Sequence, residues 1–300
     1  MVATETKRIH STLIEDSFAE AFDMKYTRLI ITAHDSYWLE AAVREFIGYS
    51  SSVIACDLEA GLDCLISKDE TPDGRPGAAL LAFGFSQDAL AGAVANRVGQ
   101  CVMTCATTAV FDGLPEAEDR LPLGKHIRFF GDGYQKSKVI GGTRYWRIPV
   151  MDGEFLVQES LGVAGGVAGG NLILQAAELE AALDGARRGI EAIDKLGGVI
   201  TPFPAGVARS GSKVGSIYKT LKASTADAYC PTLRGRVESK LHDGVNYALE
   251  IVIDGVDRDA VAAAMKSALH AIASDDIIAI AAGNYGGDLG KHHFHLRDLV

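Results

Sequence analysis

The sequence predicts an α+β fold with an internal duplication, and three observations support this prediction. Segments with the apolar composition of β-strands alternate with segments that have the apolar spacing of amphipathic helices. The order strand–helix–strand occurs four times, and a glycine-containing turn closes each copy. A length of 300 residues and a hydrophobic fraction of 48% suit one or two domains with well-filled cores.

Two strand–helix–strand copies are predicted in the first half of the chain. Before them, residues 12–22 are expected to form a short strand or turn with a helical tail. The first copy has a strand, a helix and a strand at residues 28–33, 37–49 and 52–56, with Ser36 as the helix N-cap. The second copy has the same three elements at residues 78–83, 87–98 and 101–105. An extended strand is expected at residues 141–150.

Two further copies are predicted in the second half. Their elements fall at residues 171–176, 178–195 and 198–200, and then at residues 247–255, 258–274 and 277–282. Polar or glycine-rich insertions are expected between the copies, at residues 69–77, 129–134, 162–171 and 210–216. Because two such copies give a four-stranded sheet with two helices, we predict two ferredoxin-like lobes with antiparallel sheets, at residues 1–153 and 154–300.

Composition excludes several classes of function. The net charge is −10 and no stretch gathers lysine and arginine, so nucleic-acid binding is not expected. No stretch approaches the roughly 20 apolar residues of a membrane span, and the N-terminus lacks the apolar run of a signal peptide. Five cysteines, an odd number, argue against a disulfide framework. We expect a cytoplasmic protein that binds no membrane.

Glu250 is the most unusual residue of the predicted strand at 247–255. Alternation places it on the same face as Ala248, Val252 and Asp254, and both faces of this strand are largely apolar. A buried carboxylate must be paired or must have a raised pKa, which makes Glu250 a candidate general acid/base. A structural salt bridge or a glutamate at the edge of the strand is the alternative.

The glycine-rich and Ser-x-x-Lys stretches have competing interpretations. Residues 165–171 precede a predicted strand, whereas a dinucleotide fingerprint follows one, so close backbone packing at a lobe or subunit interface is favoured. Ser210-Gly-Ser-Lys213 matches the tetrad of acyl-enzyme hydrolases, but no partner motif accompanies it. A backbone nest for an anionic or carbonyl group is the preferred interpretation.

Three other patterns are candidates for metal or ligand sites. Cys101 and Cys105 are interpreted as core thiols on one strand. His293 and His295 would share one face of a strand, but no third ligand is evident, and residues 292–295 are interpreted as a polar tail. The rigid turn at 71–77 presents Asp73 and Arg75, and the arginine is a candidate clamp for a carboxylate or phosphate.

Several of these stretches together resemble one known family over nearly the whole chain. The segments that carry the resemblance are Glu15-Asp16 with Phe18-Ala-Glu-Ala-Phe22, Thr71-Pro-Asp-Gly-Arg-Pro-Gly77, Gly99-Gln-Cys-Val102, Ala168-Gly-Gly-Asn171, Ile200-Thr-Pro-Phe-Pro204, Ser210-Gly-Ser-Lys213, Glu250-Ile-Val-Ile253 and Ala282-Gly-Asn-Tyr-Gly-Gly287. In this order they resemble the formylmethanofuran:tetrahydromethanopterin formyltransferases. The two-lobed fold of that family agrees with the duplication predicted above.

The resemblance implies an activity, substrates and partners. A formyl group would move between the amine of methanofuran and N5 of tetrahydromethanopterin, with both carriers as cosubstrates and no metal or prosthetic group. It implies a homo-oligomer, a dimer or tetramer. The chain most resembles the bacterial form from methylotrophs that oxidise formaldehyde to formate, a subunit of a formyltransferase/hydrolase complex containing an amidohydrolase. His34-Asp-Ser-Tyr37, Ala106 and Arg209 depart from the archaeal pattern.

Site residues follow from the resemblance and from residue type. The proposed acid/base carboxylate of the family falls on Glu250, and backbone amides of residues 210–213 or 283–287 are candidate donors to the oxyanion. The expected substrate-binding residues are Asp73, Arg75, Asn171, Phe203, Ser210, Ser212, Lys213, Asn284 and Tyr285. Two alternatives stay open: a non-catalytic scaffold subunit of an amidohydrolase complex, and a serine amidohydrolase that uses Ser212 and Lys213.

Overall fold

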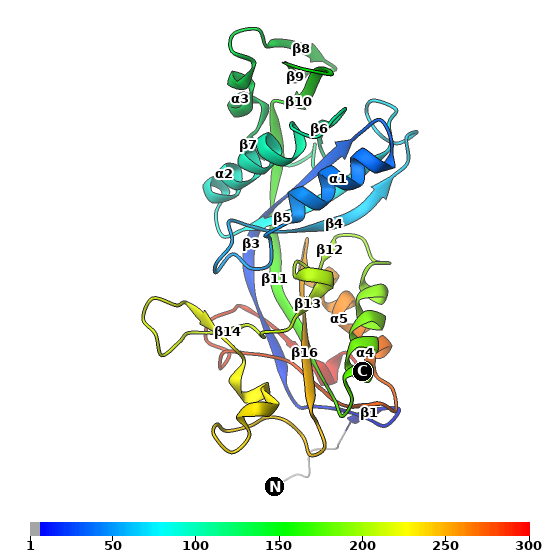
Figure 1. Ribbon diagram of the computed structural model, residues 1–300, viewed down its shortest axis with the longest axis vertical. Coiled ribbons are helices and arrows are strands. Elements are labelled where there is room, and N and C mark those ends of the chain that lie inside the picture. Colours follow the sequence, from blue (N-terminus) through cyan, green and yellow to red (C-terminus); the bar gives the residue numbers. More distant parts are fainter. Residues whose placement is uncertain (1–6) are drawn as a thin grey trace. The chain divides into compact units, whose positions relative to one another are not determined.

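Helices and β-strands alternate along residues 7–300, the part of the chain that the computed structural model describes, and this confirms the α+β prediction (Figure 1). The chain forms two units. One consists of residues 24–166, and the other joins a segment ending at Asp23 to Val167–Val300. A division at residue 153 stays a prediction. Within residues 7–300, every helix falls short of the length and apolar character that crossing a membrane requires.

The unit of residues 24–166 is built on a mixed sheet. Its strand order is β4 (Glu59–Ile66), β5 (Gly77–Gly84), β3 (Phe18–Thr32), β6 (Ala109–Asp112), β10 (Gly153–Gln158), β9 (Thr143–Val150) and β8 (Lys136–Ile140). The β6–β10 pair is parallel and the other neighbours are antiparallel. In addition, β7 (Asp119–Pro122) pairs with the start of β11 (Ser160–Ala176).

Helices α1 (Ser36–Ile47), α2 (Gln87–Arg97) and the short α3 (Gly124–Ile127) belong to this unit. Asp35, and not Ser36 as predicted, caps α1, because its carboxylate accepts hydrogen bonds from the amides of Tyr37 and Trp38. The buried faces of α1 and α2 pack into one core with the strands.

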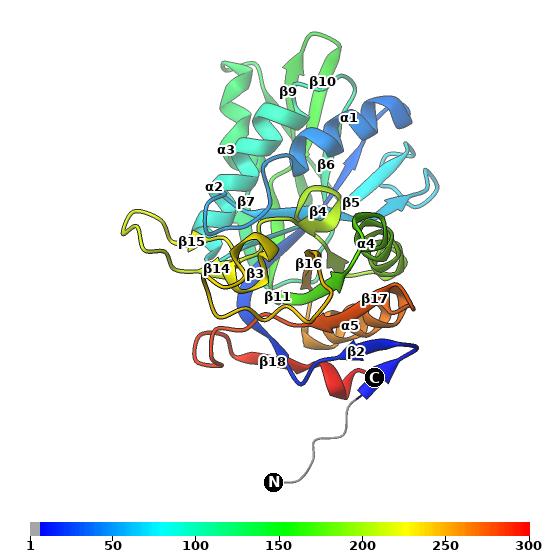
Figure 2. The same cartoon turned by 60° about the horizontal axis from the view of Figure 1, so that its bottom comes forward.

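The second unit is built around β11 and β16 (Tyr247–Gly255), which pair antiparallel. On the other side of β11 lie β17 (Ile277–Ala281), then β2 (Thr12–Ile14) and β1 (Lys7–Ile9); Figure 2 shows β2 and β17 side by side. The short strands β12 (Val199–Ile200) and β13 (Val207–Ala208) pair with the other edge of β16. Finally, β18 (His292–His295) pairs with the start of β3, and β14 (Lys213–Val214) pairs with β15 (Ala223–Ser224). Single-turn 3₁₀ helices in the two units span Arg128–Gly131, Pro204–Gly206, Asp227–Tyr229, Pro231–Leu233 and Leu296–Asp298.

Two helices, α4 (Leu179–Ile193) and α5 (Arg258–Ile272), lie next to each other in this second unit (Figure 1). Glycine makes the close approach possible. A Cβ on Gly189 of α4 would lie 2.8 Å from Ile272 Cγ1 and 2.9 Å from Ile251 Cδ1. A Cβ on Gly170 of β11 would lie 2.5 Å from Val261 Cγ1 of α5. The high glycine content therefore serves close packing inside this unit.

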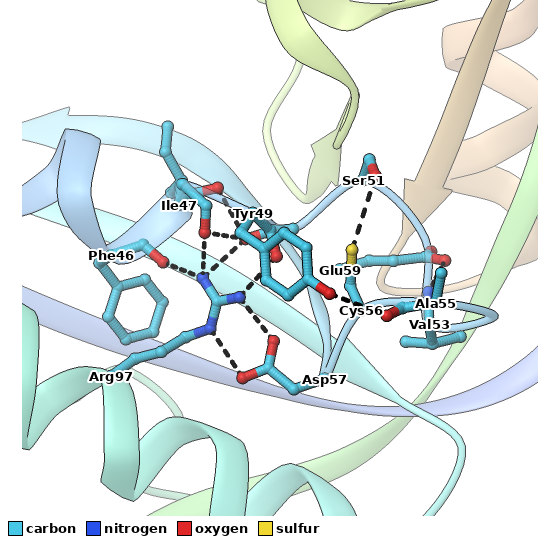
Figure 3. Close-up of polar contacts among 12 residues, drawn as sticks. Phe46, Ile47, Tyr49, Ser51, Val53, Ala55, Cys56, Asp57, Glu59 and Arg97 are labelled. Atoms are coloured by element: carbon cyan, nitrogen blue, oxygen red, sulfur yellow. Dashed lines mark hydrogen bonds and ion pairs between the residues drawn. The ribbon is translucent and has the colours of Figure 1, made fainter. Parts of the chain in front are cut away.

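The predicted strand at residues 52–56 is wrong, because this segment forms turns and the strand begins at Glu59. Figure 3 shows the reason: the buried Arg97 of α2 donates to the carbonyl oxygens of Phe46, Gly48 and Tyr49, and it pairs with Asp57 at 2.5 Å. Glu59 also accepts from the amide of Val53 at 2.9 Å. The bond to Glu59 uses an amide that a strand at 52–56 would need, and the bonds from Arg97 fix the backbone just before this segment.

The predicted strand at residues 101–105 is also wrong. Helix α2 continues into a π-helical turn, Val98–Val102, and the strand follows later as β6. Val98, Val102 and Met103 are buried in the core, so the apolar run reflects a helix end packed inside the unit. Cys101 and Cys105 are therefore not on a strand, although both are partly buried.

Two further expectations fail in long strands. Residues 162–171, predicted as an insertion, lie inside the continuous strand β11, and the helical tail expected before residue 22 is the start of β3. In β11, Gly162 has no room for a side chain, because a Cβ would lie 2.1 Å from the carbonyl oxygen of Leu114. The glycines that suggested a loop are thus strand positions, and at Gly162 and Gly170 neighbouring atoms leave no room for a side chain.

Candidate active site

Glu250 lies in the middle of β16 and is buried, as the alternation predicted. Its backbone pairs with Ile173 of β11 on one side and with Ala208 of β13 on the other. Only 4% of the residue is exposed. Because β16 is paired along both edges here, the sheet holds the backbone of Glu250 in place.

The two carboxyl oxygens of Glu250 have different surroundings. Ser212 Oγ donates to Oε1 at 2.7 Å. Oε2 is buried and has no hydrogen-bond partner among residues 7–300. Burial raises the pKa of Glu250 to about 7, and the hydrogen bonds from Ser212 oppose this rise without cancelling it. Glu250 therefore changes its protonation state near neutral pH, as a general acid/base requires.

A cavity of about 240 Å³ lies against Glu250. Its polar lining residues are Ser212, Lys213, Asp227, Tyr229, Lys240, Asn284 and Tyr285. Lys213 Nζ pairs with Asp227 Oδ2 at 2.9 Å, and the Lys213 contact lowers the pKa of Asp227. Ser212 and Lys213 thus have carboxylates as partners, Glu250 and Asp227 respectively, which differs from a serine nucleophile activated by a lysine.

The loop after β17 forms one wall of this cavity through Asn284 and Tyr285. Tyr285 Oη donates to the carbonyl oxygen of Ser212 at 2.8 Å. Asn171 anchors the start of the loop: its Oδ1 accepts from the amide of Gly283 at 2.6 Å and its Nδ2 donates to the carbonyl of Gly283 at 3.0 Å. Asn171 therefore supports the wall of the cavity instead of lining it.

Four of the five backbone amides of residues 283–287 already donate hydrogen bonds within the protein. Those of Gly283, Tyr285, Gly286 and Gly287 donate to side-chain oxygens of Asn171, Glu20, Asn284 and Glu20, respectively. These four amides are therefore not available to an oxyanion, because each already donates to a side-chain oxygen, and the role expected of the segment 283–287 stays a prediction.

Ser210 lies at a second, smaller cavity of about 30 Å³. Arg209, Cys230 and Leu249 also line it, and it shares Glu250 and Tyr229 with the larger cavity. Its volume is about that needed for a water molecule. The segment 210–213 thus reaches both cavities that Glu250 borders.

The remaining predicted residues lie elsewhere. Phe203 follows β12, is half-buried, and lines neither cavity. Asp73 and Arg75 belong to the unit of residues 24–166, where they pair at 2.7 Å. Arg75 also donates to Thr32 Oγ1 at 3.0 Å and to the carbonyl oxygen of Thr107. The contacts made by this arginine hold the turn at 71–77 in place.

The interpretation of residues 292–295 as a polar tail is wrong, because they form strand β18, which pairs with β3. His293 and His295 share a face, and their ring centroids lie 5.0 and 5.1 Å from that of Phe18. His292 Nε2 instead lies 2.7 Å from Asp23 Oδ1. Among residues 7–300, no group of three or more His, Cys, Asp or Glu side chains is arranged to hold a metal ion.

Sequence reasoning missed Tyr229 and Lys240 of the cavity wall. They lie in residues 225–246, a segment of turns and 3₁₀ helices without the periodicity that identifies helices and strands. Burial, with smaller contributions from Glu15 and Glu250, raises the pKa of Tyr229, so its hydroxyl stays a hydrogen-bond donor at neutral pH.

This combination defines a class of protein: an α+β protein with a buried carboxyl group of raised pKa at the wall of a polar cavity, which is typical of an active site. The family follows from comparison with known proteins. The sequence profile of "Formylmethanofuran-tetrahydromethanopterin formyltransferase" matches residues 8–150, and that of its proximal lobe matches residues 153–299. The chain belongs to this family, which confirms the resemblance found in the sequence.

Individual relatives match over almost their full lengths. The formylmethanofuran–tetrahydromethanopterin formyltransferase of Methylococcus capsulatus is 49% identical, over 97% of this chain and 99% of that protein. The solved formyltransferase from Methanosarcina barkeri has a TM-score of 0.91 and 42% identity, covering 98% of this chain and 100% of that one. The solved formyltransferase/hydrolase complex from Methylorubrum extorquens, in complex with methylofuran, contains a chain with a TM-score of 0.94 and 46% identity, covering 98% and 99%.

Proposed function

We propose that this chain transfers a formyl group between the amine of methanofuran and N5 of tetrahydromethanopterin, with Glu250 as general acid/base. The observation that carries the mechanism is the buried carboxyl group of Glu250, a residue that lines the cavity and whose Oε2 has no hydrogen-bond partner among residues 7–300. Family membership supports the two carriers as substrates. The family resemblance implies that both carriers are cosubstrates and that no prosthetic group takes part, and we include this in the proposal.

Each step moves one proton. In the direction of methanofuran formylation, the carboxylate of Glu250 accepts a proton as the amine attacks the formyl carbon. A tetrahedral intermediate forms with a negative oxygen. The C–N bond to the pterin then breaks, and protonated Glu250 gives its proton to the departing nitrogen. A pKa of about 7 suits both steps, because acceptance and donation are then nearly balanced at neutral pH.

Other groups of the cavity have supporting roles in this proposal. The hydroxyl of Tyr229 and the ammonium of Lys240 are the side-chain donors that best fit an oxyanion, since both line the cavity beside Glu250. The ring of Tyr285 offers an apolar surface against a pterin or furan ring. Lys213 would bind an anionic tail of the substrate.

The cellular setting is proposed from the relatives. One related chain is part of a formyltransferase/hydrolase complex. We infer that this chain also forms a dimer or tetramer within a complex that contains an amidohydrolase subunit, in the cytoplasm, during oxidation of formaldehyde to formate. The duplicated ferredoxin-like lobes, divided near residue 153, belong to the same proposal, and the end of one family profile at residue 150 supports that boundary.

The proposal is tested by incubating purified protein with formyl-tetrahydromethanopterin and methanofuran and measuring formylmethanofuran. Transfer without any partner chain supports the proposal. Binding of either carrier without transfer would instead favour a scaffold subunit. A covalent formyl adduct at Ser212 in mass spectrometry would favour the serine amidohydrolase.

A further inference from the structure

Glu20 accepts four hydrogen bonds from the backbone of a single loop. The residue lies near the start of β3 and is 1% exposed. Its Oε2 accepts from the amides of Tyr285 at 2.7 Å and Gly287 at 2.9 Å. Its Oε1 accepts from the amides of Leu289 and Gly290, both at 2.6 Å. Every donor belongs to the segment between β17 and β18.

The backbone of this loop is shaped to reach the carboxylate. Gly286 and Gly287 have φ angles of +89° and +86°, which residues with side chains rarely adopt. A Cβ on Gly290 would lie 2.5 Å from the carbonyl oxygen of Ala21 and 2.8 Å from Glu20 Cγ. The glycines therefore allow four backbone amides of this loop to point at one carboxylate, as in a backbone nest.

The carboxylate of Glu20 is stabilised by these donors. Burial alone would raise the pKa of Glu20, but hydrogen bonds from the amides of Gly290, Tyr285, Gly287 and Leu289 outweigh burial and lower it. Glu20 is therefore ionised at neutral pH, and the loop is held by charge-assisted hydrogen bonds, which are stronger than neutral ones.

A continuous chain of contacts joins Glu20 to Glu250. Glu20 holds the amide of Tyr285, and Tyr285 Oη donates to the carbonyl of Ser212. Ser212 Oγ in turn donates to Glu250 Oε1. Asn284, next to Tyr285, lines the same cavity as Glu250.

We propose that Glu20 is a positioning residue for formyl transfer: it fixes the loop of residues 284–290, and through Tyr285 and Ser212 it fixes the geometry and dryness of the Glu250 site. This inference rests on the proposed function. Glu20 does not touch the cavity itself, so its effect on the reaction passes through the loop. Displacement of the loop would admit water to Glu250 and misplace Tyr285.

The test is Glu20→Gln. One amide oxygen can still accept two loop donors, but the NH₂ group faces the other two and repels them. We expect kcat to fall by about 10²-fold, the order expected for misplaced catalytic groups. We also expect the acid limb of the pH–rate profile to move to lower pH, because hydration of Glu250 lowers its pKa towards the ordinary value. The titratable and charged groups around the cavity, Lys213, Asp227, Tyr229 and Lys240, are unchanged in this variant.

Asp112→Asn is the matched control. Asp112 is also a buried carboxylate in the unit of residues 24–166: its Oδ1 accepts from the amides of Leu114 and Gly162 at 2.9 Å each, and its Oδ2 pairs with Arg120 at 2.6 Å. We expect both variants to lower the melting temperature, and only Glu20→Gln to change kcat and the pH profile. Equal kinetics in the two variants would overturn the positioning role.

Two measurements keep the proposal testable if Glu20→Gln fails to fold. In the wild-type protein, hydrogen exchange of the four amides that donate to Glu20 should be slow; rapid exchange would show that Glu20 does not hold the loop. Tyr285→Phe keeps the hydrogen bonds between the loop and Glu20 but removes the hydroxyl contact to Ser212. It should move the acid limb of the pH–rate profile to lower pH, as Glu20→Gln does. An unchanged profile would overturn the route through Tyr285. Absence of transfer by the wild-type protein would instead reject the proposed function, which separates the two failures.

Discussion

Replacing Glu250 by glutamine keeps the shape of the side chain and the acceptor for Ser212 Oγ but removes the titration. If Glu250 transfers the proton, turnover should fall by about 10²–10⁴-fold, the usual effect of losing a general acid/base. Substrate affinity should change little, because the volume and polarity of the cavity wall are kept. The assay is formyl transfer between the two carriers, measured at saturating concentrations of both.

The effect on stability depends on pH, and its sign follows from the raised pKa. Below pH 4.5 the side chain is neutral in both the folded and the unfolded state. As pH rises from 4.5 to about 7, the unfolded chain releases the proton first, so the wild-type protein loses stability. The pKa difference (7 minus 4.5, at about 1.4 kcal/mol per pH unit) corresponds to about 3 kcal/mol above pH 7.

Glutamine has no such penalty. The melting temperature of Glu250→Gln, relative to wild type, should therefore rise between pH 5 and pH 8. A difference that does not depend on pH would show that Glu250 is not a buried carboxyl group with a raised pKa. Turnover within a few-fold of wild type in the folded variant would remove Glu250 from the mechanism. The control for both measurements is to show that the variant is folded at pH 5.

Three further outcomes are expected. Ser212→Ala removes a hydrogen bond that lowers the pKa of Glu250, so the acid limb of the pH–rate profile should move up by about one pH unit; an unmoved limb would contradict the contact. Chelation with EDTA should leave transfer intact, because His292 is paired with Asp23 and the rings of His293 and His295 lie against Phe18; loss of activity restored by zinc would contradict this. Sedimentation at micromolar concentration should show a dimer or tetramer, to which exposed apolar side chains such as Ile217 contribute, and a monomer would refute it.

Periodicity in the sequence was sufficient to predict the long helices, and it failed where distant side chains decide the backbone. Helices α1, α4 and α5 fall at the predicted positions because each has a regular apolar face, and α2 also lies where it was predicted although its apolar periodicity is weak. The segment 52–56 looked like a strand because of its apolar residues, but Arg97 binds the carbonyls before it, and no local pattern reveals a contact between residues about 50 positions apart. The glycines of β11 misled the prediction for a similar reason, since the helix that requires Gly170 comes later in the chain.

In the candidate site, too, some residues could be predicted from local sequence and others depend on distant contacts. The apolar residues on both faces of its strand predicted that Glu250 is buried and made it a candidate, and the family resemblance then favoured the acid/base role over a structural salt bridge. Tyr229 and Lys240 lie in irregular backbone and had no local signal. Glu20 stood within a recognised motif, but its function depends on amides 265 to 270 residues away. Side chains that support a site through long-range hydrogen bonds are visible only in three dimensions.

The division of the chain into two units has a consequence for biosynthesis. Residues 24–166 are contiguous and can fold as soon as they leave the ribosome, whereas the other unit needs its first and last segments together. Thr12 bonds to Ser274, which is 262 residues later. At about 5–20 residues per second, the N-terminal strands wait on the order of 13 to 50 s for β17. During that interval the edge of β2 that will pair with β17 is open, so the nascent chain is most exposed to misfolding just before its synthesis ends.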